Sequence, residues 1–284
     1  MAVANEPTGN LKIVIMNTDG KKKADGIRNK ADKKKQVICD VVKTTGATLF
    51  LFQEFMWRGI SGRAWEGKYR LPSHLEYIGN KEACILFDNS KVTVENVRGK
   101  TGIQRSTLER MCIRKVKTKG VPIVEFICIS WHGRRSKKTV EILIEEFESM
   151  LKYISKLSEE LVLPVLLAGD FNLTAKDIEP HLSSLSLDLH NYEPTTRRKS
   201  ENIIDFFISS ESLEMSGIKA LTLESETGVV EVLSLFDHDP VVSLMSTNPE
   251  NEDILISEMD NLSLSSSTSN TDTTSSDSSA EIED

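Results

Sequence analysis

The sequence predicts an α/β protein, a four-layer α-β-β-α sandwich in which two mixed sheets pack face to face with helices outside. Three observations carry this prediction. Apolar runs of strand length recur along residues 11–246, and two longer segments space their apolar residues as amphipathic helices do. Their order is strand, helix, strand, several strands, helix and strand, which favours two layered sheets. Most of the runs also end in polar residues, as expected where loops from both sheets meet in a cleft.

The elements are expected in the following order. Residues 11–16 form an apolar run that predicts a strand, and residues 27–43 carry apolar side chains at nearly helical spacing. The clearest amphipathic helix covers residues 140–157, where apolar side chains recur three and four positions apart. The other apolar runs predict strands at residues 47–52, 83–87, 91–97, 111–117, 122–131, 163–168, 203–209 and 240–245. The close spacing of the runs between 83 and 131 implies meander connections.

Composition indicates a soluble globular protein that stays inside the cell, in the cytoplasm or the nucleus. Of its 284 residues, 39% are hydrophobic, and no stretch approaches the roughly 18 apolar residues that a membrane span needs. The first ten residues lack the positive charge and the apolar core of a secretion signal. The four cysteines lie far apart in apolar segments without a CxxC pair, so we expect buried free thiols at Cys39, Cys84, Cys112 and Cys128.

Charge and composition divide the chain into a flexible amino terminus at residues 1–10, a folded domain at 11–246 and a disordered acidic tail at 247–284. Residues 246–284 hold 10 of the 43 acidic residues and none of the 35 basic ones, which leaves a net charge of +2 on the rest. The tail is rich in Ser and Thr and cannot bury enough apolar surface to fold. Its apolar cluster at 254–262 is a candidate docking turn for a protein partner, with an apolar spot in a linker as the alternative.

Several predicted strands end in the same kind of chemistry. Residues 166–175, LLAGDFNLTA, lead from an apolar strand directly into Asp170 and Asn172, which share one face of an extended chain while Phe171 occupies the other. Turn chemistry is the alternative explanation. Comparable polar ends follow other runs, at Asn17, Asp19, Glu54, His132, Asp237 and His238. Hydrolysis of a phosphodiester needs carboxylates for a divalent metal, neutral donors for the phosphate oxygens, a base and an acid, and this set supplies each of them.

These motifs resemble the endonuclease/exonuclease/phosphatase superfamily, which includes the secreted deoxyribonucleases and the apurinic endonucleases. The resemblance covers residues 11–245, and its most specific parts are QE at 53–54, GDFN at 169–172 and DHDPV at 237–241, in the right order. ENIIDFFISS matches the penultimate motif of the superfamily through Asp205. NKEACILFDNSKV resembles the deoxyribonucleases where a glutamate supports a catalytic histidine, which pairs Glu82 with His132. MNTDG resembles the apurinic endonucleases, in which the acid at the position of Asp19 helps to hold metal.

The resemblance implies a Mg²⁺ cofactor, with Mn²⁺ as the alternative. The implied ligands are oxygen donors, as a hard cation prefers, and they are Asn17, Asp19, Glu54 and Asp237. A solvated acid at a strand end is the alternative explanation for Glu54 and Asp19.

The implied catalytic residues come from every part of the folded domain. They are Glu54, Glu82, His132, Asp170, Asn172, Asp205 and His238. Asp170 would orient or deprotonate the attacking water, while Asn172 and His238 would hydrogen-bond the phosphate as charge builds on it. Turn chemistry is again the alternative.

Each of the two candidate histidines has a candidate carboxylate partner, Glu82 for His132 and Asp205 for His238. A neighbouring carboxylate favours the charged imidazolium form. His132 would then be the general acid for the leaving oxygen. Without the family resemblance, a satisfied polar residue at a strand end is the more ordinary explanation for His132.

Basic residues beside these motifs indicate a polyanionic substrate. The candidate substrate-binding residues are Arg110, Arg134, Arg135, Arg197 and Arg198. Four of them form two clusters, Arg134 and Arg135 after His132 and Arg197 and Arg198 before Asp205. Exposure of a charged loop to solvent explains either cluster alone equally well. The basic run at residues 21–35 has the spacing of a two-part nuclear import signal, but it overlaps the first predicted helix, so a solvated helix face is the preferred explanation.

Together these features favour a Mg²⁺-dependent phosphodiesterase that acts on nucleic acid, a deoxyribonuclease-like endonuclease. Two alternatives stay open. A phosphatase for phosphoinositides or nucleotides would use the same residues on a monoester. A binding or scaffold protein would keep the fold without turnover, but it would not need so complete a set of catalytic residues.

Overall fold

The computed structural model describes residues 10–19, 28–55, 71–97, 102–135, 139–190, 203–221, 236 and 238–247. Within these ranges the strands form two six-stranded sheets, here called sheet A and sheet B. The predicted flexible amino terminus and acidic tail fall outside the described residues, except for Asn10 and Thr247, so both stay predictions. None of the described helices has the combination of length and hydropathy that crossing a membrane requires.

Sheet A takes strands from both ends of the described chain, in the order β11-β12-β1-β2-β4-β3. Its strands are β1 (Leu11–Asn17), β2 (Leu49–Gln53), β3 (Leu75–Gly79), β4 (Ala83–Asp88), β11 (Leu213–Ala220) and β12 (Val241–Thr247). β1 and β2 are parallel because helix α1 (Arg28–Thr45) crosses between them. The other neighbours pair in antiparallel fashion, so the sheet is mixed.

Sheet B is built from one continuous part of the chain, in the order β5-β6-β7-β8-β10-β9. Its strands are β5 (Val92–Asn96), β6 (Met111–Thr118), β7 (Glu125–His132), β8 (Val165–Asp170), β9 (Leu187–His190) and β10 (Asp205–Ser210). β5, β6 and β7 form the expected meander, and α3 (Val140–Leu161) makes a parallel crossover from β7 to β8. All residues of β8 are buried, which explains its continuous apolar run.

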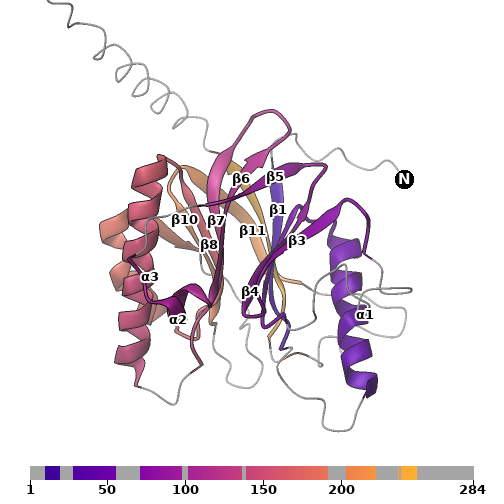
Figure 1. Ribbon diagram of the computed structural model, residues 1–284, viewed down its shortest axis with the longest axis horizontal. Coiled ribbons are helices and arrows are strands. Elements are labelled where there is room, and N and C mark those ends of the chain that lie inside the picture. Colours follow the sequence, from indigo (N-terminus) through magenta and orange to yellow (C-terminus); the bar gives the residue numbers. More distant parts are fainter. Residues whose placement is uncertain are drawn as a thin grey trace, which may run out of the picture. The chain divides into compact units, whose positions relative to one another are not determined.

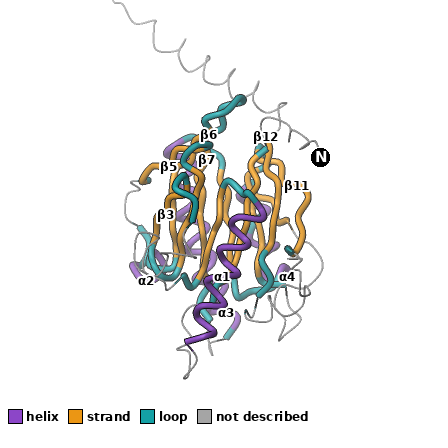
Figure 2. Tube along the Cα trace, turned by 90° about the vertical axis from the view of Figure 1, so that its right-hand side faces the viewer, coloured by secondary structure: helices purple, strands orange, loops and turns teal. Residues whose placement is uncertain are grey.

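Three apolar clusters hold the four layers together. Residues from the facing sides of both sheets, among them Ile15 and Phe126, form the core between the sheets. α1 packs on the outer face of sheet A through residues such as Ile38, and α3 packs on sheet B through Phe147 and Leu151. Figure 1 shows α1 and α3 on opposite sides of the paired sheets, and Figure 2 shows α1 in front of the strands. The predicted four-layer sandwich is confirmed.

The structure also contains elements that the apolar runs did not indicate. Three of them, β3, β9 and β11, lie at sheet edges and mix charged with apolar residues along half-exposed strands. The others are short, namely α2 (Arg105–Leu108), α4 (Ala175–Ile178), and the 3-10 turns η3 (Glu179–His181) and η4 (Ser183–Leu185). β7 begins at Glu125 rather than at 122, and Val121 and Ile123 are exposed between β6 and β7.

Gly169 in the GDFN motif has a structural reason to be glycine. Its φ is +150°, and a Cβ atom at this position would lie 2.0 Å from the carbonyl oxygen of Trp131 on β7. We therefore expect Gly169→Ala to lower the free energy of unfolding by about 3 kcal/mol, because β7 and β8 must separate to admit the methyl group. Urea unfolding would measure the loss. Gly120→Ala, where a Cβ meets nothing within 4 Å, is the control, and equal midpoints for the two variants would contradict the prediction.

Candidate active site

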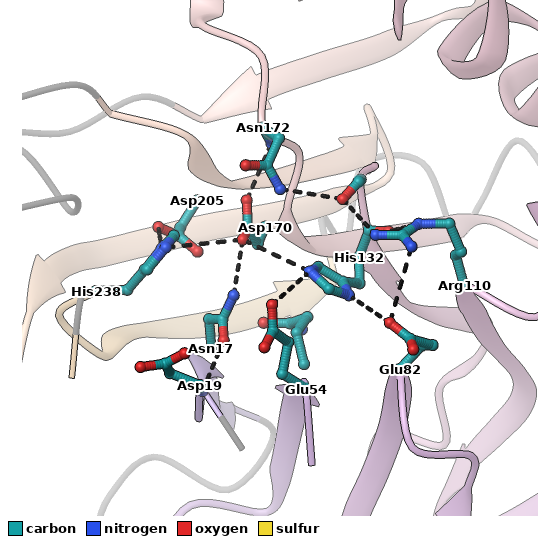
Figure 3. A network of polar contacts seen from close by, with 12 residues as sticks. Asn17, Asp19, Glu54, Glu82, Arg110, His132, Asp170, Asn172, Asp205 and His238 are labelled. Atoms are coloured by element: carbon teal, nitrogen blue, oxygen red, sulfur yellow. Dashed lines mark hydrogen bonds and ion pairs between the residues drawn. The ribbon is translucent and has the colours of Figure 1, made fainter. Parts of the chain in front are cut away.

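Strand register brings the predicted residues together at one end of the two sheets (Figure 3). In sheet B, His132 at the end of β7 lies opposite Asp170 at the end of the parallel strand β8. Asp170 in turn lies opposite Asp205 at the start of the antiparallel strand β10. In sheet A, the parallel strands β1 and β2 end together at Asn17 and Gln53. The strand ends of both sheets therefore meet at one place.

Asp170 lies at the centre of the polar network. One carboxylate oxygen, Oδ2, accepts a hydrogen bond from the Asn17 side chain at 2.8 Å, and it lies 3.8 Å from His238 Nε2 and 4.0 Å from His132 Nε2. The side chain is fully buried, and this burial raises the pKa of Asp170. The two imidazoles and the Asn17 hydrogen bond act in the opposite direction. Asp170 is thus a buried acid whose pKa is raised by burial and lowered by the two imidazoles and Asn17.

His132 lies between two carboxylates. Its Nδ1 is 3.1 Å from Glu82 Oε2, and its Nε2 is 3.3 Å from Glu54 Oε1. Burial acts to lower the pKa of His132, but Glu54, Glu82 and Asp170 outweigh it and raise that pKa above its ordinary value. Within the described residues, Nε2 makes no hydrogen bond of good geometry despite its closeness to Glu54. The imidazolium form is favoured, with Nδ1 facing the Glu82 carboxylate and Nε2 facing the Glu54 carboxylate.

His238 and Asp205 form a second buried pair. The distance from His238 Nδ1 to Asp205 Oδ2 is 2.8 Å, and this contact directs Nε2 toward Asp170. Asp205 begins β10, so its position depends on the pairing of β10 with β8. The structure thus gives both histidines the carboxylate partners that the sequence motifs imply.

A small pocket opens among these strand ends. It is lined by Asn17, Asp19, Glu54, Arg135, Asp170, Asn172 and His238. All seven are candidate site residues of the sequence motifs. Asp237, Arg197 and Arg198 lie outside the described residues, so their roles stay predictions.

Three residues of the pocket have left-handed backbone conformations. The φ angles are 43° at Asp19, 52° at Glu54 and 53° at Asn172. Asp and Asn tolerate this region, but Glu adopts it rarely, so the backbone at Glu54 is locally strained. Such strain is typical of functional sites, where the surrounding fold holds a side chain in place.

Asn172 reaches the pocket by a different route from the extended strand that its spacing suggested. β8 ends at Asp170, and the backbone N–H of Asn172 donates to Asp170 Oδ1 at 3.0 Å. The Asn172 side chain also donates to the carbonyl oxygen of Gly133 at 3.0 Å. The turn chemistry that sequence reasoning weighed as an alternative is therefore what places Asn172 at the site.

Arg110 does not line the pocket; it contacts the end of β7 and Glu82, and its contact with substrate stays a prediction. Its guanidinium donates to the carbonyl oxygens of His132 and Gly133 at 2.6 Å each, and lies 3.8 Å from Glu82 Oε2. Burial lowers the pKa of Arg110, and the nearby carboxylates, Glu82 first among them, compensate for this in part. Arg110 therefore holds the end of β7 and the Glu82 carboxylate in position from outside the pocket lining.

The other two described arginines differ in their contacts. Arg134 forms an ion pair with Glu146 on α3, with 3.2 Å between Nε and Oε2. Arg135 is exposed and contributes to the pocket lining. Arg135 is thus the arginine of this pair that is placed to meet a bound anion.

Comparison with known proteins identifies the fold. No family model matches the chain, and no curated protein matches its sequence. An endonuclease/exonuclease/phosphatase family protein from Bacteroides thetaiotaomicron matches in structure, with a TM-score of 0.62 at 17% identity, over 86% of this chain and 100% of that chain. This chain has the endonuclease/exonuclease/phosphatase fold.

Two further structures show the range of proteins that share this fold. The human Nocturnin catalytic domain matches with a TM-score of 0.63 at 11% identity, over 84% of this chain and 95% of that chain. The mannosyl-6-phosphatase Bt3783 of Bacteroides thetaiotaomicron matches with a TM-score of 0.59 at 18% identity, over 83% and 99%. At such low identity, the likeness establishes the endonuclease/exonuclease/phosphatase fold, and the chemistry must be argued from the site.

The pocket fits the divalent metal that the endonuclease/exonuclease/phosphatase resemblance implies. Its donors are carboxylate and amide oxygens, which suit a hard cation such as Mg²⁺. Glu54, Asn17 and Asp19 come from the sheet A side of the pocket and would hold such an ion. Asp170, Asp205 and His238 also have potential ligand atoms within 4.8 Å of one another, and His238 is hydrogen-bonded to Asp205 within this group.

Two features of this site do not follow from the sequence patterns. Gln53 links the sheets below the site, because its Nε2 donates to Ser130 on β7 at 3.1 Å and Ser130 donates to the Phe52 carbonyl at 3.2 Å. Lys34 lies in the basic run that was interpreted as a solvated helix face, yet its side chain is 12% exposed and contacts Asp19. A signal existed for Lys34: it occupies a position of the apolar stripe, between Ala31 and Ile38 at helical spacing.

Proposed function

We propose that this protein is a divalent-metal-dependent phosphoesterase whose substrates are phosphodiesters of nucleic acid. The observation that carries the proposal is the arrangement around His132. Glu82 holds Nδ1, while Nε2 lacks a well-formed hydrogen bond among the described residues and lies 4.0 Å from Asp170. A charged imidazole beside a buried carboxylate provides both a candidate acid and a candidate base at the same end of the two sheets.

The proposed roles follow from these contacts. Asp170 accepts hydrogen bonds on both oxygens and would orient the attacking water and take its proton. His132 would donate the proton from Nε2 to the leaving oxygen. Asn172 and His238 would donate hydrogen bonds to the phosphate oxygens. A cation held by Glu54, Asn17 and Asp19 would polarise the phosphate.

The preference for nucleic acid rests on charge. Arg135 lines the pocket, so the rim next to β7 can meet a phosphate that flanks a scissile bond. A phosphomonoesterase is the second candidate, because the pocket is small and one protein of this fold is a mannosyl-6-phosphatase.

A substrate screen of the purified full chain with Mg²⁺ separates the candidates. The panel is single-stranded DNA, double-stranded DNA, RNA, a phosphoinositide, a nucleotide and mannose 6-phosphate, each with an EDTA arm. We expect cleavage of internal phosphodiester bonds in at least one nucleic acid, and no release of phosphate from the monoesters. Phosphate release alone would assign the protein to the monoesterases. Cleavage of none would support a binding protein that has the fold without turnover.

A further inference from the structure

Lys34 of α1 places its charged group in contact with Asp19, a residue of the pocket. Its Nζ lies 2.9 Å from the carbonyl oxygen of Asp19 and 3.2 Å from Asp19 Oδ2. Both side chains are 12% exposed, so the pair is largely removed from water. Asp19 lines the pocket together with Glu54, whereas Lys34 does not line it. The ammonium therefore reaches Asp19 from outside the pocket lining.

A second contact holds the ammonium in place. Lys34 Nζ lies 5.3 Å from the ring centroid of Phe236, which is within the range of a cation–π interaction. Phe236 is buried and precedes His238 by two residues. Lys34 thus joins α1 to the segment after β1 and to the segment before β12.

Burying the Lys34 ammonium costs free energy unless an opposite charge stabilises it. A lysine within the apolar stripe of a helix loses hydration, and the usual occupant of such a position is an apolar side chain that packs on the sheet. The Asp19 carboxylate compensates for this loss because a buried ammonium is stabilised by a close opposite charge. The same contact has a consequence for Asp19, since its negative charge is offset by a fixed positive one.

We propose that Lys34 is a fixed counter-ion that lowers the affinity of the pocket for divalent cations by neutralising Asp19. This inference rests on the proposed metal-dependent function. Lys34 is a positioning residue, and it contacts Asp19 rather than the reacting atoms. Because the ammonium competes with a bound cation for the charge of Asp19, removing it should strengthen cation binding. A lysine with a purely structural role would give the opposite result, since losing it would loosen Asp19 and weaken binding.

Binding of Mn²⁺, followed through the electron paramagnetic resonance signal of the free ion, tests the inference on the full chain. We expect Lys34→Met to lower the dissociation constant for Mn²⁺ about tenfold, a typical size for coupling between two sites. Lys34→Arg, which keeps the charge, should stay close to the wild type. Lys33→Met is the matched control, because Lys33 is exposed on the same helix and its loss changes the net charge equally.

A double-mutant cycle decides whether the effect passes through Asp19. In an Asp19→Asn background, Lys34→Met should leave the Mn²⁺ dissociation constant unchanged. Unchanged or weaker binding in the folded single variant would overturn the inference, and thermal unfolding of each variant would establish folding. If Lys34→Met does not fold, Lys34→Gln replaces it in the same cycle. Absence of Mn²⁺ binding by the wild type would instead overturn the metal-dependent function itself.

Discussion

Replacement of Glu54 by glutamine is expected to lower kcat/KM by on the order of 10³-fold, because a metal-bound carboxylate supports several kcal/mol of transition-state stabilisation. Glutamine keeps the volume of the side chain but removes the charge that would hold a cation at the sheet A side of the pocket. The left-handed backbone at Glu54, with φ of 52°, is as accessible to glutamine as to glutamate, so the fold should persist. Initial rates on the best substrate of the screen measure the loss.

Chelation provides an independent arm of the same experiment. EDTA should reduce the wild type to the level of Glu54→Gln, and excess Mg²⁺ should restore the wild type alone. Glu211→Gln is the control, because Glu211 is exposed in the turn between β10 and β11 and its replacement changes the charge equally. Full wild-type activity in excess chelator would show that Glu54 has no cation to hold.

Replacement of His132 by glutamine should slow an unactivated phosphodiester by about 10²–10⁴-fold, the usual contribution of a general acid. The same variant should hydrolyse a nitrophenyl phosphodiester with less than about a tenfold loss, because a nitrophenolate leaves without a proton. The contacts of His132 motivate this split, since Glu82 holds Nδ1 and leaves Nε2 for the leaving oxygen. Comparison of kcat on the two substrates measures it.

His74→Gln is the control for this substitution, since His74 is exposed, lies 3.9 Å from Asp88 and does not line the pocket. It should leave both rates unchanged. Equal losses on the two substrates in His132→Gln would remove the general-acid role and leave His132 as a phosphate-binding or structural residue.

The central strands could be predicted from the sequence because strands that are buried on both faces consist mostly of apolar residues. β2, β4 and β8 are buried along their whole length, and each appears in the sequence as an apolar run that ends in one polar residue. The edge strands could not be found in this way. β11, for example, alternates buried, exposed and half-exposed residues, and it is held as a strand by pairing with β12 across the sheet.

The site residues at strand ends could be predicted for a related reason. A polar residue at the end of a buried strand lies at the open end of the sheet. Asn17, His132 and Asp170 are such residues. The partners that approach from other layers were harder to predict. Arg110 contacts the backbone of β7, and Lys34 contacts Asp19. Both contacts depend on how a turn or a helix packs on a sheet. That information is non-local, and sequence spacing alone does not contain it.

The distribution of strands between the sheets has a consequence for biosynthesis. Sheet B uses residues 92–210, whereas β1 of sheet A lies between β2 and β12, the last of the described strands. A chain that emerges from the ribosome can therefore complete sheet B while one edge of β1 is still unpaired. His238 and the closing strand β12 emerge after all of sheet B, and β12 is complete only when residue 247 has emerged. Incomplete translation products thus lack the assembled pocket, and any activity at this site begins only when synthesis of the fold is finished.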